Sequence, residues 1–306
     1  MALNSLLAQM NPSSPIYIVS KGRWESRLTS KALHQMGCPH YIVVEEEEYA
    51  SYESSVDSSA TLLILDKSYQ RDYDTCDRLG DTKSKGPGAA RNFAWDHSIA
   101  NGADWHWVMD DNIRRFRRLH NSLRVAVSDA TIFKCMEDFC QRYENVGMGG
   151  PNYTGFAKGI RPPFVKNTRI YSCNLIRNDT PYRWRGRYNE DTDLSLRMLK
   201  DKWCTISFNA FLQDKQLTQT MKGGNTEAFY AKEGTYNKSV MQVKLHPDVS
   251  RLAWKFNRWH HHVDYRPFKE TPLRLREDVT FDDYDNYGMV YQKKIDGEWV
   301  EGPVER

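Results

Sequence analysis

The amino-acid sequence predicts an α/β fold with a mostly parallel central sheet flanked by helices, followed by a C-terminal extension. Three observations lead to this prediction. Short β-branched runs alternate with helical stretches from residue 16 to residue 208, as in successive βαβ units. The chain has 306 residues, of which 40% are apolar, and this is enough for one large buried core. From residue 246 onward the composition becomes aromatic and basic, then acidic, so we divide the chain into 1–245 and 246–306.

Glycine and proline mark the expected ends of the elements in the first half of the chain. Pro15 precedes the first β-branched run, Gly37 ends the first helix, and Gly102 closes a later helix that 86–88 opens. In order, the expected elements are a strand at 16–19, a helix at 26–36, strands at 41–44 and 61–65, a helix at 89–101 and a strand at 105–109.

The second half continues the alternation of helices and strands. Ser128 or Asp129 caps a helix that extends to about residue 143. A stretch rich in glycine, asparagine and threonine at 222–240 predicts a mobile loop. The remaining expected elements are strands at 146–150 and 169–176, a helix at 191–202 and a strand at 204–208.

The composition argues against several classes of protein. Charged residues make up 27% and aromatic residues 12%, a balance that disordered chains lack. No stretch approaches the roughly 18 apolar residues of a membrane span, and residues 1–7 lack the regions of a signal peptide. The six cysteines are scattered without a CxxC pair, which argues against zinc and disulfide frameworks and suits a reducing compartment. We therefore expect a cytoplasmic protein without a membrane partner.

Asp110, Asp111 and Asn112 directly follow the expected strand at 105–109. In open α/β sheets, ligands bind beyond the carboxyl ends of the strands, so these oxygens lie where a ligand is expected. Magnesium or manganese ions prefer such oxygens and would bridge them to a diphosphate, which assists departure of a nucleotide. The alternative interpretation is that the aspartates only cap a turn.

The helix before this strand begins with Gly-Pro-Gly-Ala-Ala-Arg-Asn at 86–92. Free glycine N–H groups, a helix N-terminus and a nearby cation suit a phosphate or a nucleotide. Gly88, Arg91 and Asn92 are therefore candidates for binding the phosphates of a nucleotide substrate. An ordinary junction between a loop and a helix is the alternative.

Basic residues gather in three segments, although the net charge of the chain is only +3. In the third segment, 251–269, aromatic residues alternate with basic ones, a pattern that contacts phosphates and stacks on exposed bases. An amphipathic helix that packs its Trp and Phe side chains on the core is the alternative for this segment. The candidate DNA-contacting residues are Arg114, Arg115, Arg117, Arg118, Arg185, Arg187, Arg251, Trp254, Lys255, Arg258 and Trp259.

Four motifs in order, at 16–23, 88–92, 108–112 and 184–194, resemble those of the GT-A glycosyltransferases. The similarity covers about residues 15–245. Within that superfamily the chain looks most like the TET-associated glycosyltransferases of bacteriophages, which add sugars to 5-hydroxymethylpyrimidines in DNA. The ordered series is more specific than any one motif. The resemblance implies a GT-A-like, Rossmann-related catalytic domain over 1–245 that binds a UDP-sugar.

The resemblance also implies roles for the residues that would hold the donor. The outer positions of the family's DxD motif, for ribose and metal, fall on Asp110 and Asn112. Many members carry a carboxylate at the latter position, whereas an amide supplies an oxygen without a charge. Metal binding would then rely more on Asp111 and on the donor's phosphates. The segment that would face the nucleotide base and ribose consists of Ser20, Lys21, Gly22 and Arg23.

Glu190 and Asp191 match the acidic motif that supplies the general base in inverting members of the superfamily. A base must lie near the acceptor hydroxyl, and Asp191 is the first choice, with Glu190 as the alternate. Both residues would also favour the start of a helix, and a retaining enzyme would not need the base. His246 matches the region of a metal-ligating histidine, and the run 260–262 is a rival for that role.

These observations together predict a metal-dependent hexosyltransferase that moves a sugar from a UDP-sugar to a hydroxymethylpyrimidine in DNA. The expected cofactor is Mn²⁺ or Mg²⁺, and the expected location is the host cytoplasm if a phage encodes the chain. An acceptor base within a duplex would have to be extruded or presented in single-stranded form. The alternatives are a protein, glycan or lipid acceptor, a non-catalytic DNA-binding protein on a degenerate transferase fold, and a nucleotidyltransferase.

Overall fold

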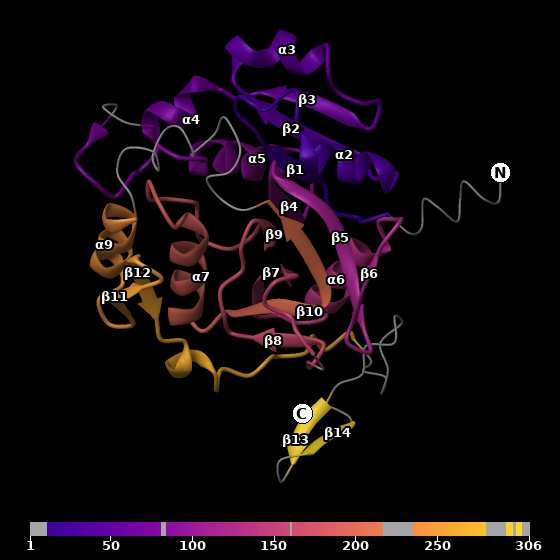
Figure 1. Ribbon diagram of the computed structural model, residues 1–306, viewed down its shortest axis with the longest axis vertical. Coiled ribbons are helices and arrows are strands. Elements are labelled where there is room, and N and C mark those ends of the chain that lie inside the picture. Colours follow the sequence, from indigo (N-terminus) through magenta and orange to yellow (C-terminus); the bar gives the residue numbers. More distant parts are fainter. Residues whose placement is uncertain are drawn as a thin grey trace, which may run out of the picture.

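The computed structural model describes residues 11–80, 84–159, 161–216 and 235–279, together with the backbone of 292–295 and 298–301. One large mixed sheet forms its centre, and helices pack on both faces of this sheet (Figure 1). The elements of the first half are β1 (Ile16–Val19), α2 (Leu28–Gln35), β2 (His40–Val44), η1 (Glu46–Glu48), α3 (Tyr49–Glu53), β3 (Ala60–Ile64), α4 (Lys67–Asp72), α5 (Gly88–Ala100), β4 (Trp105–Asp110), β5 (Ile113–His120) and β6 (Leu123–Ala126).

The second half adds more strands to the same sheet, and then a hairpin after the last long helix. Its elements are α6 (Thr131–Gln141), β7 (Val146–Tyr153), β8 (Phe164–Lys166), β9 (Cys173–Arg177), α7 (Glu190–Lys200), β10 (Cys204–Lys215), α9 (Tyr236–Leu245), β11 (Ser250–Lys255), β12 (Arg258–Val263), η4 (Arg266–Phe268), β13 (Gln292–Ile295) and β14 (Glu298–Glu301). None of the helices in the described part of the chain is long and apolar enough to cross a membrane.

Two hydrophobic cores lie on opposite faces of the sheet, because successive side chains of a strand point to opposite faces. In β1, Ile16 and Ile18 join the core under α2 and α6, whereas Tyr17 and Val19 join the core under α5 and α7. A strand with side chains buried on both faces has no polar positions to alternate with. This explains why the inner strands are continuous apolar runs in the sequence.

The sheet is mixed, and the expectation of a mostly parallel sheet was therefore wrong. Its strand order is β3-β2-β1-β4-β9-β7-β10-β5-β6, with β8 paired to β10. The strands β3, β2, β1 and β4 pair in parallel, as predicted. Beyond them, β9 runs antiparallel to both β4 and β7, and β5 runs antiparallel to β10. Short apolar runs indicate strands but carry no information about their direction.

The segment 250–263 forms a β-hairpin, so the alternative of an amphipathic helix there was also wrong. Strands β11 and β12 pair antiparallel, from Ser250 with Val263 to Lys255 with Arg258. Phe256 and Asn257 form the turn, with φ of 52° and 57°. Two central residues with positive φ are typical of the two-residue turns that match the twist of a hairpin.

Several boundaries differ from those expected. The sequence did not predict β5 and β6, and β10 extends seven residues past the expected end at residue 208. The strand expected at 169–176 begins four residues later and ends one residue later, as β9 at 173–177. Most of the loop expected at 222–240 lies outside the described residues, and its last part begins α9. The division of the chain at residue 246 stays a prediction.

Candidate active site

Two segments leave the sheet side by side at the carboxyl ends of β1 and β4. The two strands are parallel, and Val19 is paired with Asp110 in register. The chain after β1 (20–23) and the chain after β4 (110–112) therefore emerge at the same edge. Neighbouring strand ends of this kind form the usual ligand-binding edge of an α/β sheet.

Asp111 faces the chain after β1. Its Oδ1 forms an ion pair with Arg23, and its Oδ2 accepts a hydrogen bond from Ser20 Oγ at 2.8 Å. Ser20 Oγ also lies 2.6 Å from the hydroxyl of Tyr52, which is fully buried. Burial raises the pKa of Asp111, and Arg23 opposes this rise. The structure thus brings Ser20 and Arg23 together with Asp111. Binding of a nucleotide-sugar donor by these residues stays a prediction.

The remaining two residues of this segment lie at its outer side. Lys21 Nζ contacts both carboxylate oxygens of Glu45 at 2.7 and 2.8 Å, and the side chain of the lysine is exposed. The N–H of Gly22 donates to Glu48 at 2.9 Å. These contacts hold 20–23 as an ordered turn beside the strand ends.

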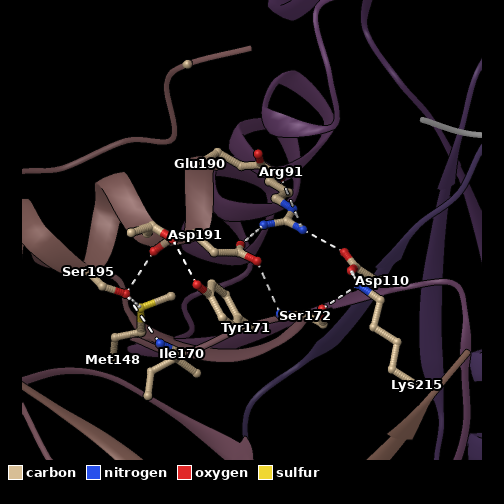
Figure 2. A network of polar contacts seen from close by, with 12 residues as sticks. Arg91, Asp110, Met148, Ile170, Tyr171, Ser172, Glu190, Asp191, Ser195 and Lys215 are labelled. Atoms are coloured by element: carbon tan, nitrogen blue, oxygen red, sulfur yellow. Dashed lines mark hydrogen bonds and ion pairs between the residues drawn. The ribbon is translucent and has the colours of Figure 1, made fainter. Parts of the chain in front are cut away.

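Asp110 turns the other way, toward a cluster of charged side chains (Figure 2). Its Oδ1 accepts a hydrogen bond from Arg91 at 2.6 Å, and its Oδ2 accepts one from Lys215 at 2.5 Å. Arg91 also pairs with Asp191, and its Nη2 lies 3.7 Å from Glu190 Oε1. One buried guanidinium of α5 therefore joins the end of β4 to the N-terminus of α7.

The charge balance of this cluster explains the titration of Glu190. Three carboxylates, of Asp110, Glu190 and Asp191, share two cations, Arg91 and Lys215. Burial, reinforced by the charge of Asp191, raises the pKa of Glu190 to about 7 although Arg91 opposes the shift. Burial also acts to raise the pKa of Asp110. The positive charges of Lys215 and Arg91 outweigh this effect and hold the pKa of that carboxyl well below its usual range. Near neutral pH, Glu190 is thus the group poised to take up a proton.

Ser172 connects the cluster to the neighbouring strands. Its N–H donates to Asp191 Oδ2 at 3.2 Å, and its Oγ accepts a hydrogen bond from Lys215 Nζ at 2.7 Å. The hydroxyl of Tyr153 lies 2.7 Å from the same Oγ. The sequence did not single out Ser172, Tyr153 or Lys215. No local pattern marks them, since they come from three segments that only the sheet brings together.

The residues at the start of α5 position the helix more than they open a binding surface. A side chain at Gly88 would collide with the hydroxyl of Tyr73, because an added Cβ would lie 1.9 Å from it. The side-chain amide of Asn92 is fully engaged with the backbone of Trp184: its Nδ2 donates to the carbonyl oxygen, and its Oδ1 accepts a hydrogen bond from the N–H. Arg91 stacks over the ring of Trp184, with 4.6 Å from its Cζ to the ring centroid. These contacts fix Arg91 in its central place.

The carboxylates at the end of β4 do not fit a divalent cation in the arrangement that the structure shows. Each of the four carboxylate oxygens of Asp110 and Asp111 already faces a donor group of the protein. Among the side-chain oxygens of 110–112, Oδ1 of Asn112 is the one that is buried without a hydrogen-bond partner. A hard cation prefers six or more oxygen ligands. Within 11–80, 84–159, 161–216 and 235–279, no group of three or more His, Cys, Asp or Glu side chains could hold a metal ion.

His246 lies apart from these aspartates, in a second ion-pair group behind α7. Its Nε2 is 2.9 Å from Asp193 Oδ1, and its Nδ1 is 3.1 Å from Lys200 Nζ. Asp193 is fully buried and also pairs with Arg185 and Arg197. These partners hold the pKa of Asp193 at about 2 although burial opposes the shift. The structure therefore places His246 where it anchors α7, not beside Asp110 and Asp111.

The candidate DNA-contacting residues separate into exposed and buried groups. Arg187 is fully buried and pairs with Asp77 at 2.7 Å, so no surface of it is left for DNA and that prediction was wrong. Arg185 is held by Asp193, and Arg117 is held by Asp214. The exposed members are Arg114, Arg115 and Arg118 on β5, and Arg251, Trp254, Lys255, Arg258 and Trp259 on the β11–β12 hairpin.

These two exposed groups lie on opposite sides of the molecule (Figure 1). Strand β5 starts next to the carboxylates and runs away from them along the sheet, whereas the β11–β12 hairpin packs against α9. The hairpin exposes Trp254 by 58% and Phe256 by 87%, an unusual amount of aromatic surface for side chains of this size. It is the stronger of the two candidates for binding a nucleic acid.

Comparison with known proteins identifies the family. No curated protein sequence matches the chain. The model of one family, described as TET-Associated Glycosyltransferase, matches residues 14–224. This range contains both strand ends, the cluster around Arg91 and the start of α7. The chain belongs to the family of TET-associated glycosyltransferases.

Proposed function

We propose that this protein transfers a sugar from a UDP-sugar to the hydroxyl group of 5-hydroxymethylcytosine, or of a related hydroxymethylpyrimidine, in DNA. The observation that supports this most directly is the cluster of Asp110, Glu190 and Asp191 around Arg91, at the carboxyl edge of the sheet. It combines a candidate base with cations for a diphosphate. Membership of the TET-associated glycosyltransferase family supports a transferase that acts on modified bases of DNA.

Glu190 is the better candidate for the general base, although the sequence favoured Asp191. Both oxygens of Asp191 are engaged, one by Arg91 and the other by the N–H of Ser172. Glu190 lies further from Arg91, at 3.7 Å, and its pKa of about 7 suits proton uptake near neutral pH. In the reaction, its carboxylate takes the proton of the acceptor hydroxyl as that oxygen bonds to the anomeric carbon of the sugar.

The bond that breaks in this step joins the anomeric carbon to the diphosphate, and the nucleoside diphosphate leaves with the electron pair. Lys215 and Arg91 supply positive charge beside Asp110 for this leaving group. The turn at 20–23, with Arg23 at its inner side, supports binding of the nucleotide next to them. Both cations are also paired with carboxylates of the cluster, so the leaving group would share Arg91 and Lys215 with them.

A divalent ion at Asp110, Asp111 and Asn112 stays a prediction of the sequence. To bind one, the two aspartates would have to release Lys215 and Arg23. Transfer rates measured with manganese and with a chelator test this directly. Stimulation by manganese would support the metal site, whereas unchanged rates in the chelator would support neutralisation by the side chains.

The acceptor is tested with oligonucleotides that contain either 5-hydroxymethylcytosine or cytosine. The protein is incubated with UDP-glucose or UDP-N-acetylglucosamine, and the nucleosides are analysed by mass spectrometry after digestion. We expect a gain of one hexose or N-acetylhexosamine on the hydroxymethylated base alone. The absence of any mass gain with either donor, with and without manganese, would refute the proposal. Donor turnover that DNA does not influence would favour a protein, glycan or lipid acceptor.

A further inference from the structure

A small cleft lies next to the charged cluster, between the end of β7, strand β8 and the segment 168–171. Its volume is about 200 Å³. Pockets that hold drug-sized molecules have roughly 300–1,000 Å³, so this cleft suits a single base more than a whole nucleotide-sugar. None of the residues predicted for donor binding lines it.

Aromatic rings form one side of the cleft. The rings of Tyr153 and Tyr171 are nearly parallel, with centroids 6.0 Å apart and an angle of 22° between their planes. Phe156, which is 56% exposed, meets Tyr153 edge to face at 5.4 Å. Flat aromatic surfaces of this kind stack on nucleic-acid bases that have left the helix.

Gln213 adds an unused hydrogen-bond acceptor to the wall. Its Nε2 donates to the carbonyl oxygens of Pro151 and Tyr171, each at 2.9 Å, which fixes the orientation of the amide. Its Oε1 is buried without a hydrogen-bond partner in the described structure. A buried acceptor of this kind costs about 1–3 kcal/mol. The amino group of a cytosine, or the ring N–H of a uracil, would satisfy it.

Two residues that line the cleft suit the two parts of a nucleotide. The hydroxyl of Tyr153 lies 2.7 Å from Ser172 Oγ, and Ser172 contacts Asp191 and Lys215 of the charged cluster. The guanidinium of Arg169 lies 5.2 Å from the ring of Tyr171. Arg169 forms no ion pair with any acidic side chain in the described part of the chain, so its charge is available for a phosphate.

We propose that this cleft receives the acceptor base, a pyrimidine extruded from DNA, and directs its hydroxymethyl group toward the charged cluster. The base stacks on the aromatic wall and donates a hydrogen bond to Gln213 Oε1, while Arg169 holds the adjacent phosphate. This inference rests on the proposed function, and it assigns the acceptor half of the site to residues that lie apart from the donor half.

The test separates binding of the acceptor from binding of the donor. Tyr171→Leu removes the stacking surface but keeps an apolar side chain, and Arg169→Ala removes the cation. Stacking of one base contributes about 1–3 kcal/mol, so we expect kcat/KM for hydroxymethylcytosine DNA to fall by roughly tenfold to a hundredfold in Tyr171→Leu. The dissociation constant of the UDP-sugar, measured by calorimetry, should stay unchanged in both variants.

Tyr49→Leu, on α3 far from the cleft, is the matched control, and thermal melting shows whether each variant folds. If Tyr171→Leu does not fold, Phe156→Ala tests the same wall at an exposed position. Variants that modify hydroxymethylcytosine DNA as fast as the wild type would overturn the cleft's role. A wild-type protein that modifies no DNA at all would instead refute the proposed function itself, so the two failures are distinguishable.

Discussion

Replacement of Glu190 by glutamine tests the catalytic proposal most sharply. Glutamine has nearly the same size as the protonated acid and cannot accept the proton of the acceptor hydroxyl. The wild-type site holds three carboxylates and two cations, so the variant keeps two carboxylates matched by two cations. We therefore expect the fold to tolerate the change, whereas the transfer step loses its base.

The size of the expected loss of rate follows from the role of Glu190 as general base, and the expected pH dependence follows from the pKa of its carboxyl group. A positioned general base contributes about 10²–10⁴ to the rate, and kcat should fall by that factor. In the wild type, the carboxylate is the active form, and its pKa is about 7. The rate should therefore rise about tenfold per pH unit below pH 7, as the carboxylate fraction rises, and level off above roughly pH 8. The variant should lose this dependence.

The assay is sugar transfer to hydroxymethylcytosine DNA at saturating donor, from pH 5 to pH 9. Glu144→Gln is a matched control, because Glu144 is half-exposed and pairs only loosely with Arg274, at 3.7 Å. Calorimetry with the UDP-sugar checks that Glu190→Gln still binds its donor. A variant with wild-type kcat, or one that keeps the same rise in rate with pH, would show that Glu190 is not the base.

Three further predictions concern the donor, the acceptor and stability. Lys215→Gln removes one of the two cations beside Asp110, and we expect the dissociation constant of the UDP-sugar in calorimetry to rise by about tenfold or more. Phe256→Ala removes the aromatic tip of the β11–β12 hairpin, and fluorescence anisotropy should show DNA binding weakened about tenfold with donor binding unchanged. Asp193→Asn should lower the free energy of unfolding in urea by about 3 kcal/mol at pH 7, because Arg185 and Arg197 lose their buried counterion and His246 Nε2 loses its carboxylate partner. Because the folded-state pKa of Asp193 is depressed to about 2, its contribution is present above the ordinary pKa of an aspartate, and the difference between wild type and variant should shrink as the pH falls from 5 toward 2.

The periodicity of the sequence determined most of the elements in the first half of the chain. Strands β1 to β4 and helix α5 lie within one or two residues of their expected bounds. Each is a continuous apolar run or a helix closed by glycine, so local composition carries the signal. The sequence also predicted that 110–112 lie at a ligand-binding edge, and the resemblance assigned 20–23 to the nucleotide. The parallel pairing of β1 with β4 brings these two segments to the same edge.

The direction of the later strands was decided only by the tertiary structure. A buried strand has the same apolar pattern whether its neighbour is parallel or antiparallel, so nothing local marks β9 as antiparallel to β4. The hairpin at 250–263 was missed for a related reason. Its aromatic residues are exposed rather than buried, so the spacing of apolar positions did not follow a core.

The candidate site shows the same division. The strand-end pattern singled out Asp110 and Asp111, and the resemblance to the glycosyltransferases singled out Glu190 and Asp191 at the start of a helix. Only the tertiary structure decided which of them meet. Arg91 pairs with Asp191, which lies 100 positions further along the chain, and Lys215, the last residue of β10, donates a hydrogen bond to Asp110. Because a pKa depends on burial and on every charge nearby, the raised pKa that makes us propose Glu190 rather than Asp191 as the base could not be derived from the chain alone.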